Sequence, residues 1–277
     1  MQPVSLPPIN IPSLLRQYNL RPSKGLGQNF LQDERALQKI VTVAGIERDD
    51  TVLEIGPGLG NLTRYLALSA GSVVAVELDG KLFPALQAIL APYKNIRLIQ
   101  GDILKLASTD LVTGPGYLVV ANIPYYITSA VIRHLLEGEL RPRRLVLTVQ
   151  KEVAGRICSG PGKMSLLALS VQVYGQAGIA ATIPAGAFYP SPKVDSAVVC
   201  VDVYNSPVIP EPLLPRFFRL AKAGFGQKRK TIRNALGGMI PREQLTAGLE
   251  RAGIDPQRRA ETLTLDEWGR LVEGFQE

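Results

Sequence analysis

Residues 51–61, TVLEIGPGLGN, decide the fold of this chain. The first five are β-branched or apolar around a single acid, and a short run of that kind predicts a buried strand. Gly56, Gly58 and Gly60 then allow a sharp turn and a close approach of the backbone to a ligand, before a helix that runs to about Ser69. The spacing is GxGxG, not the dinucleotide-binding GxGxxG, and a glycine-rich turn alone is a weak signal.

The alternation of strand and helix continues on both sides of this turn. Buried strands are predicted at 72–78, 96–102, 117–122 and 144–150, and helices at 33–45 and 81–90. Elements in this order predict an α/β fold, a Rossmann-like parallel sheet with helices on both faces. Two later runs, 179–185 and 196–204, predict further strands that extend the sheet as an antiparallel edge pair.

The two ends of the chain differ from its middle. Residues 1–22 are rich in proline and predict a partly ordered extension, and residues 205–212 contain three prolines and predict a linker. Segments beyond the linker show helical spacing of apolar residues at 213–225, 242–253 and 265–275. We therefore expect an N-terminal extension (1–22), a Rossmann-like domain (23–205) and a small all-helical domain (206–277).

The bulk composition limits the class of protein. A net charge of +7 and a pI near 9.5 favour an anionic partner, nucleic acid first and a membrane surface second. One histidine, His134, and two cysteines, Cys158 and Cys200, make no zinc-site pattern, so we expect no metal. We interpret His134 as structural and the cysteines as buried thiols, with a disulfide left open. Without a signal-peptide pattern or a transmembrane-length apolar run, we expect a cytoplasmic protein with no membrane contact.

Acidic residues end the next two predicted strands after the glycine turn. Glu77 would lie beside that turn at the carboxyl edge of the sheet, where a carboxylate can accept both hydroxyls of a ribose. Asp102 could accept a hydrogen bond from the exocyclic amine of an adenine, with Ile103 on the ring face. One nucleoside fits this set, and no P-loop lysine follows the glycines. The pattern favours S-adenosyl-L-methionine over NAD or ATP.

The segment GQNFLQD, residues 27–33, precedes the first strand and has two interpretations. Gln28 and Asn29 offer amide groups, and Phe30 and Leu31 offer apolar cover. Either the segment leads into a helix capped by Asp33, or it forms a lid over the cofactor.

The stretch NIPYYITS, residues 122–129, follows the fourth strand at the same edge. The Asn122 side-chain oxygen and the backbone carbonyl of Ile123 or Pro124 are acceptors suited to an amino group with two N–H donors. Tyr125 can stack on a base. Such hydrogen bonds favour a pyramidal nitrogen close to the transition state, so the site needs positioning and no strong base.

Two later segments point to RNA. Phe188, in the Pro-stiffened loop FYPSPKVDS, either supplies a second aromatic face for a flipped base or is a core aromatic. The run 219–234 is basic without an acid and predicts a phosphate-binding surface. We expect Lys228, Arg229, Lys230 and Arg233 to bind RNA, with Arg258 and Arg259 adding to the surface.

Seven segments together resemble the ribosomal RNA adenine N6-dimethyltransferases of the KsgA (RsmA) type. They are GQNFL, EIGPGLGNLT, VELD, GDIL, NIPYYITS, FYPSPKVDSAVV and FGQKRKTIRNAL, in that order, and the resemblance runs from about Lys24 to the C-terminus. It implies a Rossmann-like methyltransferase domain with a helical C-terminal domain. It also implies S-adenosyl-L-methionine-dependent dimethylation of two adjacent adenosines in the 3′-terminal hairpin of 16S rRNA in the small ribosomal subunit.

The resemblance also implies roles for single residues. The cofactor residues would be Asn29, Leu31, Gly56, Glu77, Asp102 and Asn122, and the target-adenine residues Asn122, Pro124, Tyr125 and Phe188. The commoner family form has Leu where Ile123 stands and often Asn where Tyr126 stands, and we expect little change from either. Residues 1–20 are outside the resemblance.

Three rival interpretations stay open at this point. A large-subunit rRNA adenine methyltransferase of the antibiotic-resistance type would share most motifs. A DNA adenine methyltransferase would carry similar Asn-Pro-Tyr chemistry, although no DNA target-recognition domain is visible. A non-enzymatic assembly factor could keep the fold, but the intact set of Glu77, Asp102 and Asn122 argues against lost activity. We expect a monomer.

Overall fold

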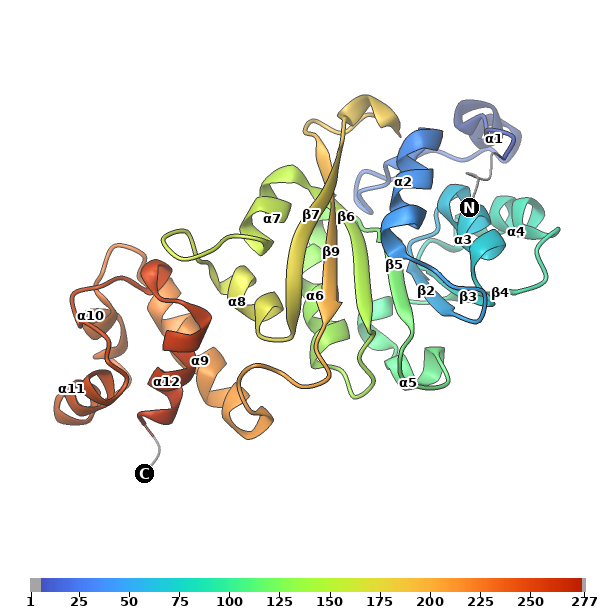
Figure 1. Cartoon of the computed structure of the whole chain (residues 1–277). Coiled ribbons are helices and arrows are strands. Elements are labelled where there is room, and N and C mark those ends of the chain that lie inside the picture. Colours follow the sequence, from blue (N-terminus) through green and yellow to red (C-terminus); the bar gives the residue numbers. More distant parts are fainter. Residues whose placement is uncertain (1–5, 276–277) are drawn as a thin grey trace. The chain divides into compact units, whose positions relative to one another are not determined.

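The computed structural model describes residues 6–275, and its contacts divide the chain into two compact units. Unit 1 holds the chain up to Ala154 together with Gly178–Val203. Unit 2 holds Gly155–Ala177 and the chain from Tyr204 onward. Figure 1 shows the course of the chain through both units.

A seven-stranded sheet with strand order β4-β3-β2-β5-β6-β9-β7 forms the frame of unit 1. Its strands are β2 (Thr51–Ile55), β3 (Ser72–Glu77), β4 (Ile96–Gln100), β5 (Leu118–Asn122), β6 (Arg144–Gln150), β7 (Gly175–Ile183) and β9 (Ser196–Val203). The pairs β4–β3, β3–β2, β2–β5 and β5–β6 are parallel. Because parallel strands run the same way, the residues that follow them gather at one edge. The predicted α/β fold is confirmed.

Helices cover both faces of this sheet, with α2 in front of the strands and α6 behind them in Figure 1. The helices of unit 1 are α2 (Glu34–Ala44), α3 (Asn61–Ser69), α4 (Phe83–Leu90), α5 (Ser108–Leu111) and α6 (Thr128–Glu137), with short 3₁₀ turns η1 (Gly80–Leu82), η2 (Ile103–Lys105), η3 (Tyr125–Ile127) and η4 (Ala185–Ala187). Helix α2 begins after Asp33, whose side chain accepts from the Ala36 amide, and ends at Gly45 in the left-handed conformation. Leu37 and Ile40 face the core, as their helical spacing predicts.

Strands β7 and β9 do not follow β6 across the sheet in the order in which they occur along the chain. Strand β9 pairs antiparallel with β6 along its whole length, from Arg144↔Asp202 to Gln150↔Ser196, and β7 lies outside β9. The expected antiparallel extension of the sheet is present. The insertion of β9 next to β6 carries Ser196 to the same edge of the sheet as the end of β5.

A small second sheet pairs β1 (Phe30–Leu31) with β8 (Phe188–Tyr189) in antiparallel register. It joins two segments that lie far apart in sequence, since Leu31 is opposite Phe188.

The described part of the N-terminal extension is ordered and contains helix α1 (Ile11–Gln17). Ile11 is fully buried and Leu15 nearly so, in a cluster with Phe30, Leu59 and Leu82. The amphipathic packing of this helix explains why a proline-rich segment folds here. Residues 1–5 of the predicted extension lie outside the described residues.

Unit 2 is helical, with α9 (Leu214–Gly226), α10 (Ile232–Leu236), α11 (Arg242–Arg251) and α12 (Leu265–Glu273), α8 (Leu166–Gln172), and 3₁₀ turns η5 (Glu211–Leu213) and η6 (Ala260–Thr262). Its core holds Phe217 and Trp268, whose rings meet edge to face at 6.4 Å. The sequence predicts three of these helices and misses α8 and α10, and also α7 (Lys151–Ile157), which crosses from unit 1 to unit 2.

The boundary of unit 2 differs from the predicted domain boundary. Residues Gly155–Ala177 belong to it by contact, although the sequence places them within 23–205. The Tyr204 amide donates to the Tyr174 carbonyl at 2.8 Å, and the Met164 amide donates to the Glu261 carbonyl at 3.1 Å. These long-range backbone bonds have no signature in local sequence. Within residues 6–275, no helix is long and apolar enough to cross a bilayer.

Candidate functional site

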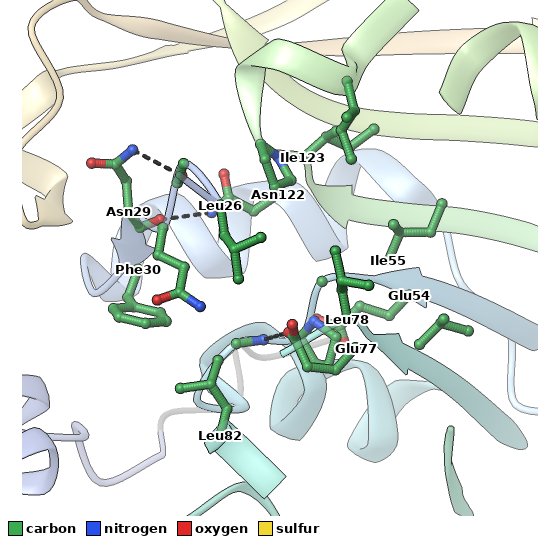
Figure 2. Close-up of a pocket in the computed structure, with 18 of the residues that line it drawn as sticks. Leu26, Asn29, Phe30, Glu54, Ile55, Glu77, Leu78, Leu82, Asn122 and Ile123 are labelled. Carbon is green, nitrogen blue, oxygen red and sulfur yellow. Dashed lines mark hydrogen bonds between the residues drawn. The ribbon is translucent and has the colours of Figure 1, made fainter. Parts of the chain in front are cut away.

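A cavity opens at the carboxyl edge of the sheet in unit 1, between the ends of β2, β3, β5 and the segment before β1 (Figure 2). All residues predicted to hold cofactor or base lie in its lining: Asn29, Leu31, Gly56, Glu77, Asp102, Asn122, Pro124, Tyr125 and Phe188. These residues come from six separate segments of the chain. The fold therefore gathers the complete predicted set around one space.

The glycine turn and Glu77 form one hydrogen-bonded unit. Glu77 is 7% exposed, and its carboxylate accepts from the Gly58 amide at 3.0 Å and from the Asp79 amide at 2.8 Å. Burial raises the pKa of Glu77 above its ordinary value, and the two amides oppose that shift. Each carboxylate oxygen is thus fixed in place and keeps a second lone pair that a ribose hydroxyl can meet.

Gly56 is held in the left-handed region at φ +68°, where a side chain is strained. A Cβ built there would point toward the opposite wall and lie 4.0 Å from both the Asn122 carbonyl oxygen and Pro124 Cδ. The missing side chain therefore leaves space between the glycine turn and the NIPY turn. A Cβ at this position would occupy part of the space between the two turns.

Asp102 caps the 3₁₀ turn η2, and one of its carboxylate oxygens accepts from the Leu104 amide at 3.1 Å. That bond orients the carboxylate beside Ile103, which is buried and also lines the cavity. An acceptor next to an apolar side chain fits an adenine amine and its ring face. These donors and acceptors fit the adenosine part of S-adenosyl-L-methionine.

Asn122 ends β5, and its amide orientation follows from its partner. The amide nitrogen donates to the backbone carbonyl of Asn29 at 3.1 Å (Figure 2). A carbonyl oxygen only accepts, so the amide nitrogen has to face Asn29 and the side-chain oxygen stays available. Asn29 in turn donates from its own side chain to the Gly27 carbonyl at 3.1 Å. Asn122 therefore presents an acceptor, as the chemistry of a target amine requires.

The segment 27–33, which contains β1, both leads into helix α2 and forms part of the cavity wall. Asp33 caps α2, whereas Gly27 and Asn29 contact the NIPY turn. Gln28 connects the segment to the Glu77 side of the cavity, because its side-chain amide donates to the carboxylate of Asp79 at 2.8 Å and the Asp79 amide donates to Glu77. The two interpretations from sequence thus apply to different residues of one segment.

Tyr125 and Phe188 differ in their surroundings. Tyr125 is half-buried, and its hydroxyl lies 2.7 Å from the Ser196 hydroxyl at the start of β9. Burial raises the pKa of Tyr125, so the hydroxyl is neutral. Phe188 is 2% exposed and packs in the sheet core with Leu31 and Ile183, while one side reaches the cavity lining. Phe188 is therefore a core aromatic by packing, and its stacking role stays a prediction.

The family model described as ribosomal RNA adenine dimethylase matches residues 19–277 of this chain.

The chain belongs to this family.

Its relatives and structural neighbours agree. It is 47% identical over 270 residues to "Ribosomal RNA small subunit methyltransferase A" of Dehalococcoides mccartyi, covering 94% of this chain and 93% of the relative. The protein of the same name from Moorella thermoacetica is 43% identical, with 95% and 96% covered. Among solved structures, a Plasmodium falciparum dimethyladenosine transferase matches with TM-score 0.76 at 25% identity, covering 87% of this chain and 95% of that one. The 23S rRNA methyltransferase ErmE matches with TM-score 0.73 at 28% identity, covering 90% and 100%.

The predicted family, the methyltransferase fold and the enzyme class, an rRNA adenine dimethyltransferase, are confirmed.

Glu54 of this adenine dimethylase lines the cavity, and the sequence interpretation missed it. It is 2% exposed, and burial raises its pKa to about 8, with the nearby Glu77 carboxylate adding to the shift. Its Oε2 atom has no hydrogen-bond partner among the described residues. The sequence did carry a signal for Glu54, because it is the one acid in the apolar strand TVLEI. Burial of a charged carboxylate there is costly, so a protonated carboxyl is favoured.

The basic run of the dimethylase lies in unit 2. Lys228, Arg229 and Lys230 are exposed in the turn between α9 and α10, and the half-buried Arg233 follows on α10. These four side chains form no ion pair with any described residue. Arg258 differs from expectation, since its guanidinium is bound to the Glu267 carboxylate and the Thr262 carbonyl. An arginine already paired in this way contributes little to phosphate binding.

The remaining titratable candidates have structural partners. A ring nitrogen of His134 lies 2.9 Å from the Leu106 carbonyl. Cys158 and Cys200 are free thiols, so the open possibility of a disulfide is excluded, and their burial is only partial. Burial raises the pKa of both, which disfavours the reactive thiolate. In residues 6–275, no group of three or more His, Cys, Asp or Glu side chains could hold a metal.

Proposed function

We propose that this chain uses S-adenosyl-L-methionine to dimethylate N6 of two adjacent adenosines in the 3′-terminal hairpin loop of 16S rRNA within the small ribosomal subunit. The observation that carries the proposal is the Asn122 amide, whose oxygen is left available at the cavity because its nitrogen is bound to the Asn29 carbonyl.

The cofactor would lie along the strand ends. Glu77 would accept the ribose hydroxyls and Asp102 the adenine amine, with Asn29 and Leu31 on the opposite wall and Gly56 leaving the passage open. When bound, this cofactor supplies an electrophilic methyl group on a sulfonium sulfur.

The residues of the chain would position the N6 amine that receives the methyl group. Asn122 Oδ1 and the backbone carbonyl of Ile123 or Pro124 would accept the two N6 protons, which opposes delocalisation of the nitrogen lone pair into the ring. Proline fixes the turn, and the Pro124 carbonyl already accepts from the Ile127 amide at 3.2 Å. Tyr125 would hold the ring face, with its hydroxyl fixed by Ser196. As the C–N bond forms and the C–S bond breaks, nitrogen becomes cationic and its proton passes to water, so no side-chain base is needed.

The RNA would be held by charge in unit 2, through Lys228, Arg229, Lys230 and Arg233. The choice of the small subunit is supported by the curated relatives, which carry that name at 39–47% identity, against 28% for ErmE.

The test uses the protein with methyl-labelled S-adenosyl-L-methionine and two acceptors, small-subunit particles from a strain without the modification, and 23S rRNA. Label is expected on two adjacent adenosines of 16S rRNA, mapped by mass spectrometry of nuclease fragments. Label in 23S rRNA alone would assign the chain to the large-subunit class. Calorimetry measures the cofactor separately, and Glu77→Gln is expected to weaken its binding about tenfold, which corresponds to one lost charged hydrogen bond.

A further inference from the structure

Tyr126 is exposed and yet belongs to the cavity. The residue is 60% exposed, the largest fraction among the exposed large hydrophobic and aromatic residues that the structure describes. It also contributes to the cavity lining beside Tyr125 and Ile127. A single exposed tyrosine on a protein surface is ordinary, but one at the mouth of a reaction cavity has an available ring face where substrate enters.

The local backbone separates the two tyrosines of the NIPYY turn. Both lie in the 3₁₀ turn η3, where three residues complete a turn and successive side chains therefore point in different directions. Tyr125 points inward to Ser196 at 2.7 Å, and Tyr126 points outward. Tyr125 thus lies toward the interior of the cavity, and Tyr126 lies at its rim.

One edge of the Tyr126 ring lies near Gly27. A Cβ built on Gly27 would lie 3.4 Å from Tyr126 Cδ1 and 3.5 Å from Cε1, so one edge of the ring packs over Gly27. Gly27 belongs to the segment whose Asn29 carbonyl orients Asn122. One edge of the Tyr126 ring therefore lies beside the segment that orients Asn122, while most of the residue stays exposed.

A base that enters the cavity leaves its stacked position, and its neighbour loses a stacking partner. An aromatic side chain at the mouth can replace that partner whichever base it meets, because every base has a π face. In a substrate with two adjacent target adenosines, the neighbour is the second target.

We propose that Tyr126 stacks on the nucleotide adjacent to the adenosine in the cavity and so positions the RNA strand for each transfer. This inference rests on the proposed function and revises the expectation that Tyr in place of Asn at this position changes little.

The test compares Tyr126→Ala with Tyr126→Phe, which keeps the ring. Tyr204→Ala is the matched control, because Tyr204 is 41% exposed, lies in unit 2 and is not part of the cavity lining. Each variant is assayed on unmodified small-subunit particles for kcat, KM and methyl groups per adenosine, and its cofactor Kd is measured by calorimetry.

Tyr126→Ala is expected to lower kcat/KM for the particle about tenfold, mainly by raising KM. A loss of this size matches the binding free energy contributed by stacking on one base. It should also raise the share of products with only one adenosine modified. Tyr126→Phe and Tyr204→Ala should stay within about twofold of the parent, and the cofactor Kd should not change. Equal activity of Tyr126→Ala and parent, equal loss in Tyr126→Phe, or a parallel loss of cofactor binding would each overturn the proposal. Failure of the parent itself to label the particle would instead overturn the proposed function.

Discussion

Two turns of this enzyme lead into helices and are fixed in opposite ways. The turn at Asn122–Ile127 is fixed by distant segments, through the Asn29 carbonyl and the Ser196 hydroxyl. The turn at residues 227–231 is held locally, with the Lys230 amide on the Gln227 carbonyl and Thr231 capping α10, and its residues 227–230 are exposed.

The difference follows from the work each turn would do. Transfer of a methyl group depends on short-range geometry, where a displacement of about 1 Å costs around 100-fold in rate. Attraction of phosphates acts over roughly 8–10 Å at moderate salt and tolerates mobile side chains. Positions that need accuracy are therefore fixed from several directions, and positions that supply charge are left exposed.

The largest effect is expected at the turn that distant contacts fix. Asn122→Ala removes the acceptor and is expected to lower kcat about 100- to 1,000-fold, the usual cost of one preorganised polar group at a reacting centre. Binding of cofactor, measured by calorimetry, should weaken only modestly. Near-normal turnover would show that the backbone carbonyls alone hold the amine.

A second test addresses the buried side of the same site. Because the pKa of Glu54 is raised to about 8, the folded enzyme keeps a proton that the unfolded chain releases near pH 4.5. The stability contribution of this group is complete below pH 4.5 and is lost as pH rises toward 8, by about 1.4 kcal/mol per pH unit. Glu54→Gln removes this pH dependence. The free energy of unfolding of the variant minus that of the parent should therefore increase by a few kcal/mol from pH 5 to pH 8.

Urea unfolding at several pH values measures this difference between variant and parent. The exposed Glu243→Gln is the matched control and should run parallel to the parent. A constant difference between Glu54→Gln and the parent across this range would mean that Glu54 titrates normally.

The exposed turn is expected to show a smaller effect that depends on salt. Lys228→Glu with Arg229→Glu should weaken RNA binding about 10- to 100-fold and lower the slope of log affinity against log salt by about 1.5 to 2, since two phosphate contacts are lost. Filter binding at four salt concentrations measures both quantities.

Lys39→Glu with Arg48→Glu makes the same change in net charge at exposed positions of unit 1 outside the cavity lining. If both double variants lose affinity equally, net charge and not the basic turn determines binding.

The smallest effect is expected for a change that keeps the ring. Tyr125→Phe removes the hydroxyl bound to Ser196 and should cost about 1 kcal/mol in the free energy of unfolding and two- to fivefold in kcat. Tyr125→Ala should lose far more activity because the stacking face is gone. Stopped assays on the same particles compare the two, and an equal loss would assign the role of Tyr125 to its hydroxyl.

The sequence predicted the parallel strands and the residues that follow them, because both signals are local. A run such as TVLEI is apolar over five residues, and the glycines and acids that follow such runs must meet at one edge when the strands are parallel. The same locality explains the misses. The grouping of Gly155–Ala177 with unit 2 rests on partners about 30 to 100 residues away, Tyr204 for Tyr174 and Glu261 for Met164.

What only the tertiary structure decided is orientation and environment. Asparagine at position 122 is visible in the sequence, but its amide is turned by the carbonyl of Asn29, 93 residues earlier. Glu54 has an ordinary carboxyl in the unfolded chain and acquires a pKa of about 8 only by burial between strand and helix. The sequence by itself determined which groups reach the edge of the sheet. Because hydrogen bonds and desolvation act through space and not along the chain, only the folded molecule decides which atom each group presents and in which protonation state.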